Sequence, residues 1–314
     1  WMIIPFITLL LAIAVAPFIN KHWWEHNYPY VAFGLGLVTV VYYLAVLQAP
    51  TRLVHTLIEY VSFIMLIGSL FVVAGGIHIR IRGKSEPLSN LFVLAIGAVL
   101  SNIVGTTGAS MILIRPYLRA NRYRIKPFHV VFFIFAVSNM GGALTPIGDP
   151  PLFLGYLKGV PFFWVLQELW EYWLIGMTLL LAVFYVLDSR SFRALPKGVQ
   201  READQHPEEA STEGMQNIFF LAVILVAVFI TDPPFVREAL MAVAAAGSYF
   251  TTKKEIHRKN DFNFLPIKEV AILFVGIFAT MIPALDWLEA NATVLGIQSA
   301  GQFYWATGIL SSVL

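Results

Sequence analysis

Cysteine is absent from this sequence, and charged residues make up only 13% of its 314 positions. Without cysteine the chain can form no disulfide, no thiolate metal site and no cysteine nucleophile. A soluble domain carries roughly a quarter charged residues, and the formal net charge of +2 is too small to indicate a nucleic-acid partner. No zinc-protease motif or nucleophile–base pattern appears. The sequence therefore predicts neither an enzyme nor a resident cofactor.

Apolar residues dominate instead, at 58% of the chain, and they occur in long blocks such as 2–18, 28–46 and 218–230. Blocks of about 20 apolar residues match the hydrocarbon thickness of a bilayer. We therefore expect an all-α polytopic membrane protein whose main partner is the lipid bilayer. Spanning helices are expected at 2–19, 28–47, 56–77, 127–158 (interrupted), 161–187, 216–231, 234–250 and 268–286.

The stretch 88–118 does not fit this series of spans. Its two apolar arms of about 10 to 14 residues are too short to cross a bilayer, and they flank a polar, glycine-rich centre. Both outer flanks are basic, so a hairpin that enters and leaves on one side keeps all these cations together. Of the 21 lysines and arginines, only Arg52, Lys158 and Arg237 then lie on the opposite side. Because positive residues favour the cytoplasmic side, we expect a re-entrant hairpin in a multi-pass protein of the inner membrane.

A polar stretch, 188–215, divides the chain into two halves and is typical of a cytoplasmic linker. Across it, the sequence Leu-Ser-Asn-Ile at 100–103 resembles Leu-Ser-Ser-Val at 310–313. Inverted repeats are the usual architecture of secondary transporters. We therefore expect a first transmembrane repeat at 1–187 and a second, 216–314, which the chain leaves incomplete at Leu314.

The first polar element within the apolar series is 101–110. Gly105 and Gly108 allow the backbone to turn there, while the neutral oxygens around them suit a desolvated cation. Its candidate ligands are Ser101, Asn102, Gly105, Thr106 and Thr107. The alternative is a polar turn that is packed between helices and satisfied internally.

The second polar element, 138–151, interrupts an apolar run from 130 to 157. Its prolines and glycines cannot continue a helix, and a broken helix at mid-membrane leaves free carbonyls and a half-helix N-terminus. An ionisable group in such a break is a functional candidate by default, although Asp149 could simply cap the following half-helix. The candidate residues of this element are Ser138, Asn139, Gly141, Gly142, Thr145 and Asp149.

Glu59 is the remaining acidic candidate within an apolar block. It lies about one turn inside the expected helix 56–77, where a long side chain can reach the membrane interface. We keep it as a second candidate for proton coupling, beside Asp149.

The two polar elements carry a resemblance to a known family. The segments "SNIVGTTGASMILIRP" (101–116) and "SNMGGALTPIGDPPLFLGY" (138–156) resemble the NhaD-type sodium/proton antiporters and the related citrate transporters of the ion transporter superfamily. In that superfamily each inverted repeat holds a re-entrant hairpin and a broken helix, whose tips jointly form the ion and substrate site. The resemblance implies that 88–118 is the first hairpin and that 127–158 is the first broken helix.

The resemblance also implies a function, namely exchange of sodium or lithium for protons across the bacterial inner membrane. Asp149 supplies a physical reason, because cation and proton can compete for its one carboxylate. The alternative is a sodium-coupled transporter of citrate or another carboxylate, which Arg115 would favour if it pointed into the site. The sequence leaves open whether the protein forms a homodimer. The expected sodium ligands are Ser101, Asn102, Ser138, Asn139 and Asp149. Such proteins continue into a second tip, so the rest of the site is expected beyond Leu314.

Overall fold

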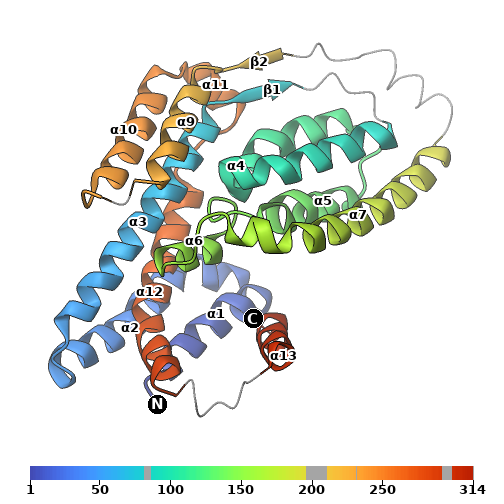
Figure 1. Ribbon diagram of the computed structural model, residues 1–314. Helices are drawn as coiled ribbons and strands as arrows, with labels where there is room; N and C mark the ends of the chain where they lie inside the picture. The colour runs from blue at the N-terminus through green and yellow to red at the C-terminus, as the bar shows by residue number, and fades with distance from the viewer. Residues whose placement is uncertain (81–85, 196–210, 231, 292–298, 314) are drawn as a thin grey trace. The chain divides into compact units, whose positions relative to one another are not determined.

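The computed structural model describes residues 1–80, 86–195, 211–230, 232–291 and 299–313, and these are almost entirely helical. The helices are α1 (Ile4–Ile19), α2 (Lys21–Val41), α3 (Pro50–Gly75), α4 (Pro87–Ala120), α5 (Pro127–Phe133), α6 (Pro150–Leu157), α7 (Trp164–Arg193), α9 (Asn217–Val228), α10 (Val236–Thr251), α11 (Lys254–Lys259), α12 (Leu265–Asn291) and α13 (Ala300–Val313) (Figure 1). Three short helical segments of other types are η1 (Tyr42–Val46), η2 (Ile134–Asn139) and η3 (Met140–Gly142). The helices α3, α4, α5 and α6 each begin at a proline, whose missing N–H would have no partner there in any case.

Five helical segments of the described chain are long and apolar enough to cross a membrane. They are Lys21–Val46, Pro50–Gly75, Pro87–Ala120, Trp164–Arg193 and Leu265–Asn291. Three shorter apolar helical segments, Ile4–Ile19, Pro127–Gly142 and Asn217–Val228, accompany them. The chain is therefore a helical, multi-pass membrane protein.

The length of α4 does not make it a single crossing, because it reverses direction at Gly105. The side chains of Asn90 and Asn121 form hydrogen bonds of 2.8 and 2.7 Å with each other. In a straight helix, 31 residues would separate them by about 46 Å. Helix α4 is thus two antiparallel arms, 87–104 and 106–120, which lie side by side (Figure 1). The hairpin expected at 88–118 has this form, while its entry into a membrane from one side stays a prediction.

The helix that begins at Pro127 is interrupted, as the sequence predicts. It continues through η2 and η3 to Gly142, and helical structure resumes only at Pro150 in α6. Asn139, at the junction of η2 and η3, has backbone angles of φ −127° and ψ −90°, which are not helical. The residues 139–149 are called the break below.

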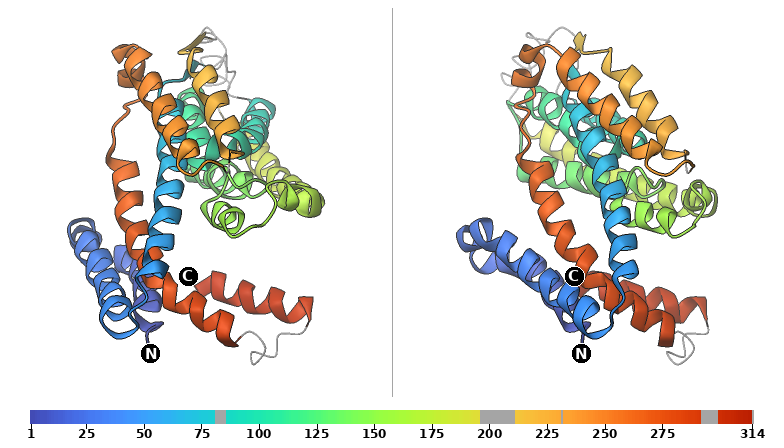
Figure 2. Two further views of the ribbon diagram at one scale, coloured as in Figure 1. Left: turned by 60° about the vertical axis from the view of Figure 1, so that its left-hand side comes forward. Right: turned by 90° about the vertical axis from the view of Figure 1, so that its left-hand side faces the viewer.

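The chain divides into two compact units, one formed by 1–61 with 264–314 and the other by 62–263. In the first unit α2 packs against α1 and α12. In the second, the arms of α4 pack against η2 and α7 around a buried core that includes Leu94, Leu113 and Phe184. Helices α9 and α10 of this unit run side by side (Figure 2).

Two short strands join parts of the second unit that are distant in sequence. Strand β1 (His78–Arg80) pairs antiparallel with β2 (Ser211–Glu213), with His78 opposite Glu213. β2 lies inside the expected linker 188–215, and α7 extends into the same stretch as far as Arg193. The described ends of the linker are therefore ordered secondary structure, and 196–210 lie outside the described residues. The division into two inverted repeats stays a prediction.

Candidate functional site

The turn of the α4 hairpin depends on one glycine. Gly105 adopts φ 78° and ψ 155°, a combination essentially restricted to glycine. A Cβ atom there would also lie 3.3 Å from the carbonyl oxygen of Ile147, which belongs to the break. The chain can therefore reverse at this point while its backbone touches the second polar element. Residues 104–108 are called the hairpin tip below.

A second close approach occurs inside the break itself. A Cβ atom on Gly142 would lie 2.5 Å from the carbonyl oxygen of Gly148 and 2.5 Å from the Thr106 methyl group. Only the missing side chain lets the two halves of the break approach each other and the tip. The glycines that the sequence marks as helix breakers thus serve as contact points between backbones.

Asn102 joins the two polar elements through both ends of its amide. Its Nδ2 group donates to the Gly141 carbonyl oxygen at 2.6 Å, and its Oδ1 accepts from the Leu144 N–H at 3.0 Å. The same Nδ2 group also donates to the Ala98 carbonyl oxygen, one turn back in its own helix, at 3.2 Å. One half-buried side chain therefore satisfies backbone groups that the interrupted helix leaves unpaired.

Thr145 and Thr106 add two more links between the elements. The Thr145 hydroxyl donates to the Asn102 carbonyl oxygen at 2.6 Å and accepts from the Gly148 N–H at 3.1 Å. The Thr106 N–H, which the turn at Gly105 frees from helical bonding, donates to the Gly148 carbonyl oxygen at 3.3 Å. The structure therefore brings some of the predicted residues of both elements, Asn102, Thr106 and Thr145 among them, into one hydrogen-bonded junction.

The serines of the two polar elements form hydrogen bonds within the packed helices next to the junction. Ser101 is fully buried, and its hydroxyl is 2.8 Å from the Gly97 carbonyl oxygen and 2.7 Å from that of Val137. Ser138 and Ser110 share a hydrogen bond of 2.8 Å. These contacts hold both arms of α4 against η2, as an internally satisfied turn would.

A cavity of about 30 Å³ opens at the junction. It lies between α3, the hairpin tip, the segment 146–148 of the break, and the start of α6. Its polar wall comes from Thr106, Thr107 and the backbone around Gly105, and none of its lining residues carries a charge. The side chains expected from the sequence to bind sodium do not line it, so their role as ligands stays a prediction.

Asp149 occupies the N-cap position of α6 and is half-buried. Its carboxylate makes no capping hydrogen bond, although its carbonyl oxygen accepts from the Leu152 and Phe153 N–H groups. The neighbours of Asp149 on both sides, Gly148 and Pro150, line the cavity. Asp149 thus stands in the chain between two residues that line the cavity, does not line it itself, and lacks the side-chain bond that a simple helix cap would make.

The remaining acidic and amide candidates lie elsewhere. Asn139 is exposed and does not line the cavity. Glu59 belongs to the part of α3 that falls in the other unit, where it is half-buried. Among the described residues, no group of three or more histidine, aspartate and glutamate side chains is arranged to hold a metal ion.

The contacts of Arg115 do not support a role in anion binding at the junction. Its guanidinium forms an ion pair of 2.7 Å with Asp261 and donates to the Lys259 carbonyl oxygen at 3.0 Å. It does not line the cavity. The cation that would favour a carboxylate substrate is therefore engaged with the end of α11.

Trp173 contributes to the break in a way that its sequence does not suggest. It lies near two glutamates and another tryptophan, a pattern typical of an interfacial belt. In the structure its indole N–H donates to the Met140 carbonyl oxygen at 2.7 Å. The Met140 methyl group also lies 2.5 Å from where a Cβ on Gly176 would be. α7 therefore supports the break through one hydrogen bond and one close contact.

Comparison with known proteins assigns this chain to a family. The model of the family described as "Putative citrate transport" matches the chain over residues 1–314. No curated protein and no solved structure matches it. With a family match over its whole length and a multi-pass helical fold, the chain belongs to the Putative citrate transport family.

Proposed function

We propose that this protein is a secondary active transporter of the inner membrane that binds sodium or lithium where the hairpin tip meets the break, and exchanges it for protons. The observation that carries the proposal is the neutral cavity of about 30 Å³ at this junction. A space of about 10–15 Å³ accommodates one water molecule. The cavity therefore has room for a small ion that has lost most of its water, and not for a tricarboxylate.

The chemistry of the cavity wall suits such an ion. Thr106 and Thr107 offer hydroxyl oxygens, and the first arm of α4 ends at the tip. The C-terminal end of a helix carries a partial negative charge and unpaired carbonyl oxygens. Hard cations prefer oxygen ligands of this kind, and the absence of a charged group on the wall leaves no fixed cation to repel them.

Coupling to protons is assigned to Asp149. Asp149 follows and precedes residues that line the cavity, is half-buried, and makes no capping hydrogen bond through its side chain. A carboxylate that binds either a proton or a nearby cation links the two fluxes, because occupation by one disfavours the other. Glu59 is the second candidate for this role.

The alternative function is sodium-coupled transport of citrate or a related carboxylate, and two observations favour it. The family description names citrate. In addition, the second arm of α4 and helix α6 both begin at the cavity, and helix N-termini attract anions. This function would require the junction to open to a larger volume than it has here.

Reconstituted protein in sealed vesicles separates the two functions. Vesicles loaded with sodium are diluted into sodium-free buffer, and the internal pH is followed with a trapped dye. In parallel, uptake of labelled citrate is measured with and without a sodium gradient. Antiport predicts proton movement that depends on sodium and no citrate uptake. Sodium-driven citrate uptake without proton exchange would establish the alternative.

The role of Asp149 is tested in the same vesicles. Asp149→Asn keeps the shape of the side chain and removes its charge, so sodium-dependent proton movement should be lost while membrane insertion is retained. The matched control is Glu168→Gln, which removes an exposed acid of α7 and should leave exchange unchanged. Normal exchange in Asp149→Asn would contradict the assignment, and Glu59→Gln would then be tested in its place.

A further inference from the structure

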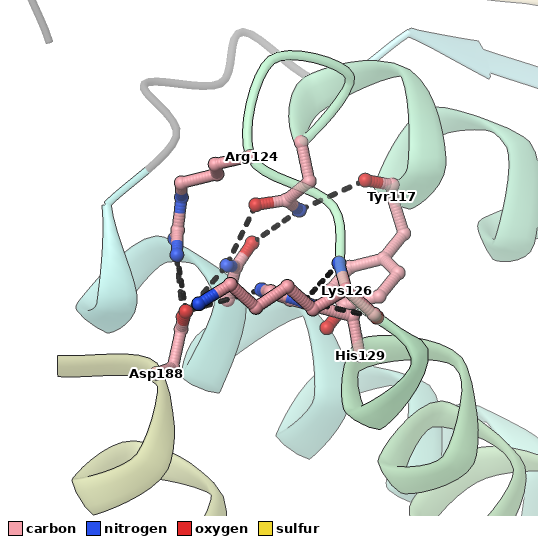
Figure 3. A network of polar contacts seen from close by, with 7 residues as sticks. Tyr117, Arg124, Lys126, His129 and Asp188 are labelled. Carbon is pink, nitrogen blue, oxygen red and sulfur yellow. Dashed lines mark hydrogen bonds and ion pairs between the residues drawn. The ribbon is translucent and has the colours of Figure 1, made fainter. Parts of the chain in front are cut away.

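The hairpin base is the end of the α4 hairpin away from the tip, where Asn90 and Asn121 meet. A buried charged network lies there, and the proposed transport chemistry does not use it. Asp188, near the end of α7, is fully buried, and its carboxylate receives hydrogen bonds from three residues (Figure 3). Arg124 donates through the two terminal guanidinium nitrogens, from Nη2 at 3.1 Å. Asn90 donates at 2.8 Å, and His129 lies with its Nε2 at 3.1 Å. The side chains of Arg124 and Asp188 are 1% and 0% exposed, so both charges are removed from water.

The partners of Asp188 come from each segment that builds the junction. Asn90 lies in the first turn of the first arm of α4, and it pairs with Asn121, the C-cap residue of the second arm. His129 lies in the first turn of α5, the helix that continues to the break. One carboxylate of α7 therefore contacts the start of the hairpin and the start of the broken helix, and reaches the end of the hairpin through Asn90.

The tautomer of His129 is set by the same network. The Lys126 N–H donates to His129 Nδ1 at 3.1 Å, so a neutral ring carries its proton on Nε2 and donates it to Asp188. The side chain thus links the backbone at the start of α5 to the carboxylate of α7. Tyr117, whose ring centroid lies 6.4 Å from that of His129, packs beside it from α4.

We propose that Asp188 is a positioning residue, which sets the placement of the hairpin tip against the break through the hairpin base. The 15 residues from Asn90 to Gly105 form an arm of about 22 Å, so a tilt of about 10° at the base moves the tip by about 4 Å. Displacements of about 1 Å at a site already change its function. The inference depends on the proposed function only for its flux measurement, because the distance measurement described next does not involve sodium.

The test uses a double variant, Asp188→Leu with Arg124→Met, which removes both charges and keeps apolar volume. Replacing a buried ion pair by apolar residues is often neutral for stability, so this protein should insert and fold. Because the chain has no native cysteine, spin labels can be placed at Ile103→Cys, beside the tip, and Tyr172→Cys, an exposed position of α7. Asn90→Ala with Asn121→Ala is the second variant, which detaches the hairpin ends and leaves the ion pair in place.

The matched control is Glu213→Gln with Lys259→Gln, which removes an ion pair of the same unit that is about one third exposed on each side. In the control, the label distance and the sodium KM should equal those of the parent. In both test variants the distance distribution should shift or broaden by about 4 Å, as the length of the arm implies. The sodium KM should rise about tenfold or more, with Vmax changed less, as misplacement of a binding site implies.

Each result has a distinct meaning. Parent-like distances in both test variants would overturn the inference, whatever the flux. Shifted distances with an unchanged sodium KM would also overturn it, because the hairpin base would then be structural only. If the parent protein moves no sodium at all, the proposed function fails, and the sodium-independent distances still decide whether Asp188 positions the tip.

Discussion

The two ends of the α4 hairpin are built from different chemistry. At the tip, the contacts with the break use backbone groups, among them the Thr106 N–H, and the neutral side chains of Asn102 and Thr145. At the hairpin base, a full carboxylate and a full guanidinium are paired out of water. Neutral hydrogen bonds contribute about 0.5–1.5 kcal/mol each, whereas breaking a buried ion pair costs about 3–5 kcal/mol. The base is therefore the fixed end of the hairpin and the tip the adaptable one.

The largest effect is expected from disrupting the charged end alone. Asp188→Asn leaves the buried guanidinium of Arg124 without its counter-charge, and should lower the free energy of unfolding by about 3–5 kcal/mol. Thermal unfolding of the detergent-solubilised protein measures this. Adding Arg124→Met to Asp188→Leu should recover most of the loss. A single variant as stable as the parent would remove the distinction between the two ends.

A smaller effect is expected at the turn. Gly105→Ala places a side chain at φ 78°, which should cost about 1–3 kcal/mol and displace the tip from the break. Unfolding and sodium flux are both measured. Gly34→Ala is the matched control, since Gly34 is an exposed residue of α2 with open space around it. Equal behaviour of the two variants would show that the turn has no special backbone requirement.

The link between the tip and the break should rank next. Asn102→Ala removes the acceptor of the Leu144 N–H and the donor to the Gly141 carbonyl oxygen. Leaving such groups unpaired costs about 1–3 kcal/mol. Asn27→Ala is the control, because the Asn27 side chain donates to the Trp23 carbonyl oxygen in an exposed contact within its own helix. We expect reduced sodium affinity in Asn102→Ala alone, measured by the sodium dependence of flux.

The smallest effect is expected where an ion pair is partly exposed to water. The Lys259–Glu213 pair, about one third exposed on each side, should contribute about 0.2–1 kcal/mol. Lys259→Gln with Glu213→Gln should therefore shift unfolding only slightly. A loss as large as that of Asp188→Asn would contradict the view that burial separates the two kinds of pair.

Much of this fold could be predicted from sequence because lipid imposes simple rules. The apolar blocks predict where most helices lie, although several ends differ by five to seven residues, as at the starts of α2 and α3. The glycines and prolines at 105, 142 and 150 mark the turn and the break. The junction between the two polar elements also followed, since freed backbone groups inside a membrane need partners.

The hairpin base could not be predicted, because its members are far apart in the sequence and individually ordinary. The sequence puts Asp188 at the start of a polar linker, and Arg124 is one of many cations on the expected cytoplasmic side. Only the tertiary fold brings them within hydrogen-bonding distance. The same applies to Trp173, whose bond to Met140 depends on how α7 packs. A signal that the sequence does carry is an asparagine near each end of the predicted hairpin, Asn90 and Asn121, which pair in the structure.

Sodium binding at the tip is tested most directly by titrating the purified protein and two threonine variants with sodium in a calorimeter. Thr106→Val removes a hydroxyl from the cavity wall. Thr39→Val removes a buried hydroxyl of α2 that has no hydrogen-bond partner among the described residues. Loss of one oxygen ligand, at about 1 kcal/mol or more, should raise the sodium Kd at least about fivefold in Thr106→Val and leave it unchanged in Thr39→Val. Unchanged affinity in Thr106→Val, or no saturable binding in the parent, would contradict a cation site between the hairpin tip and the break.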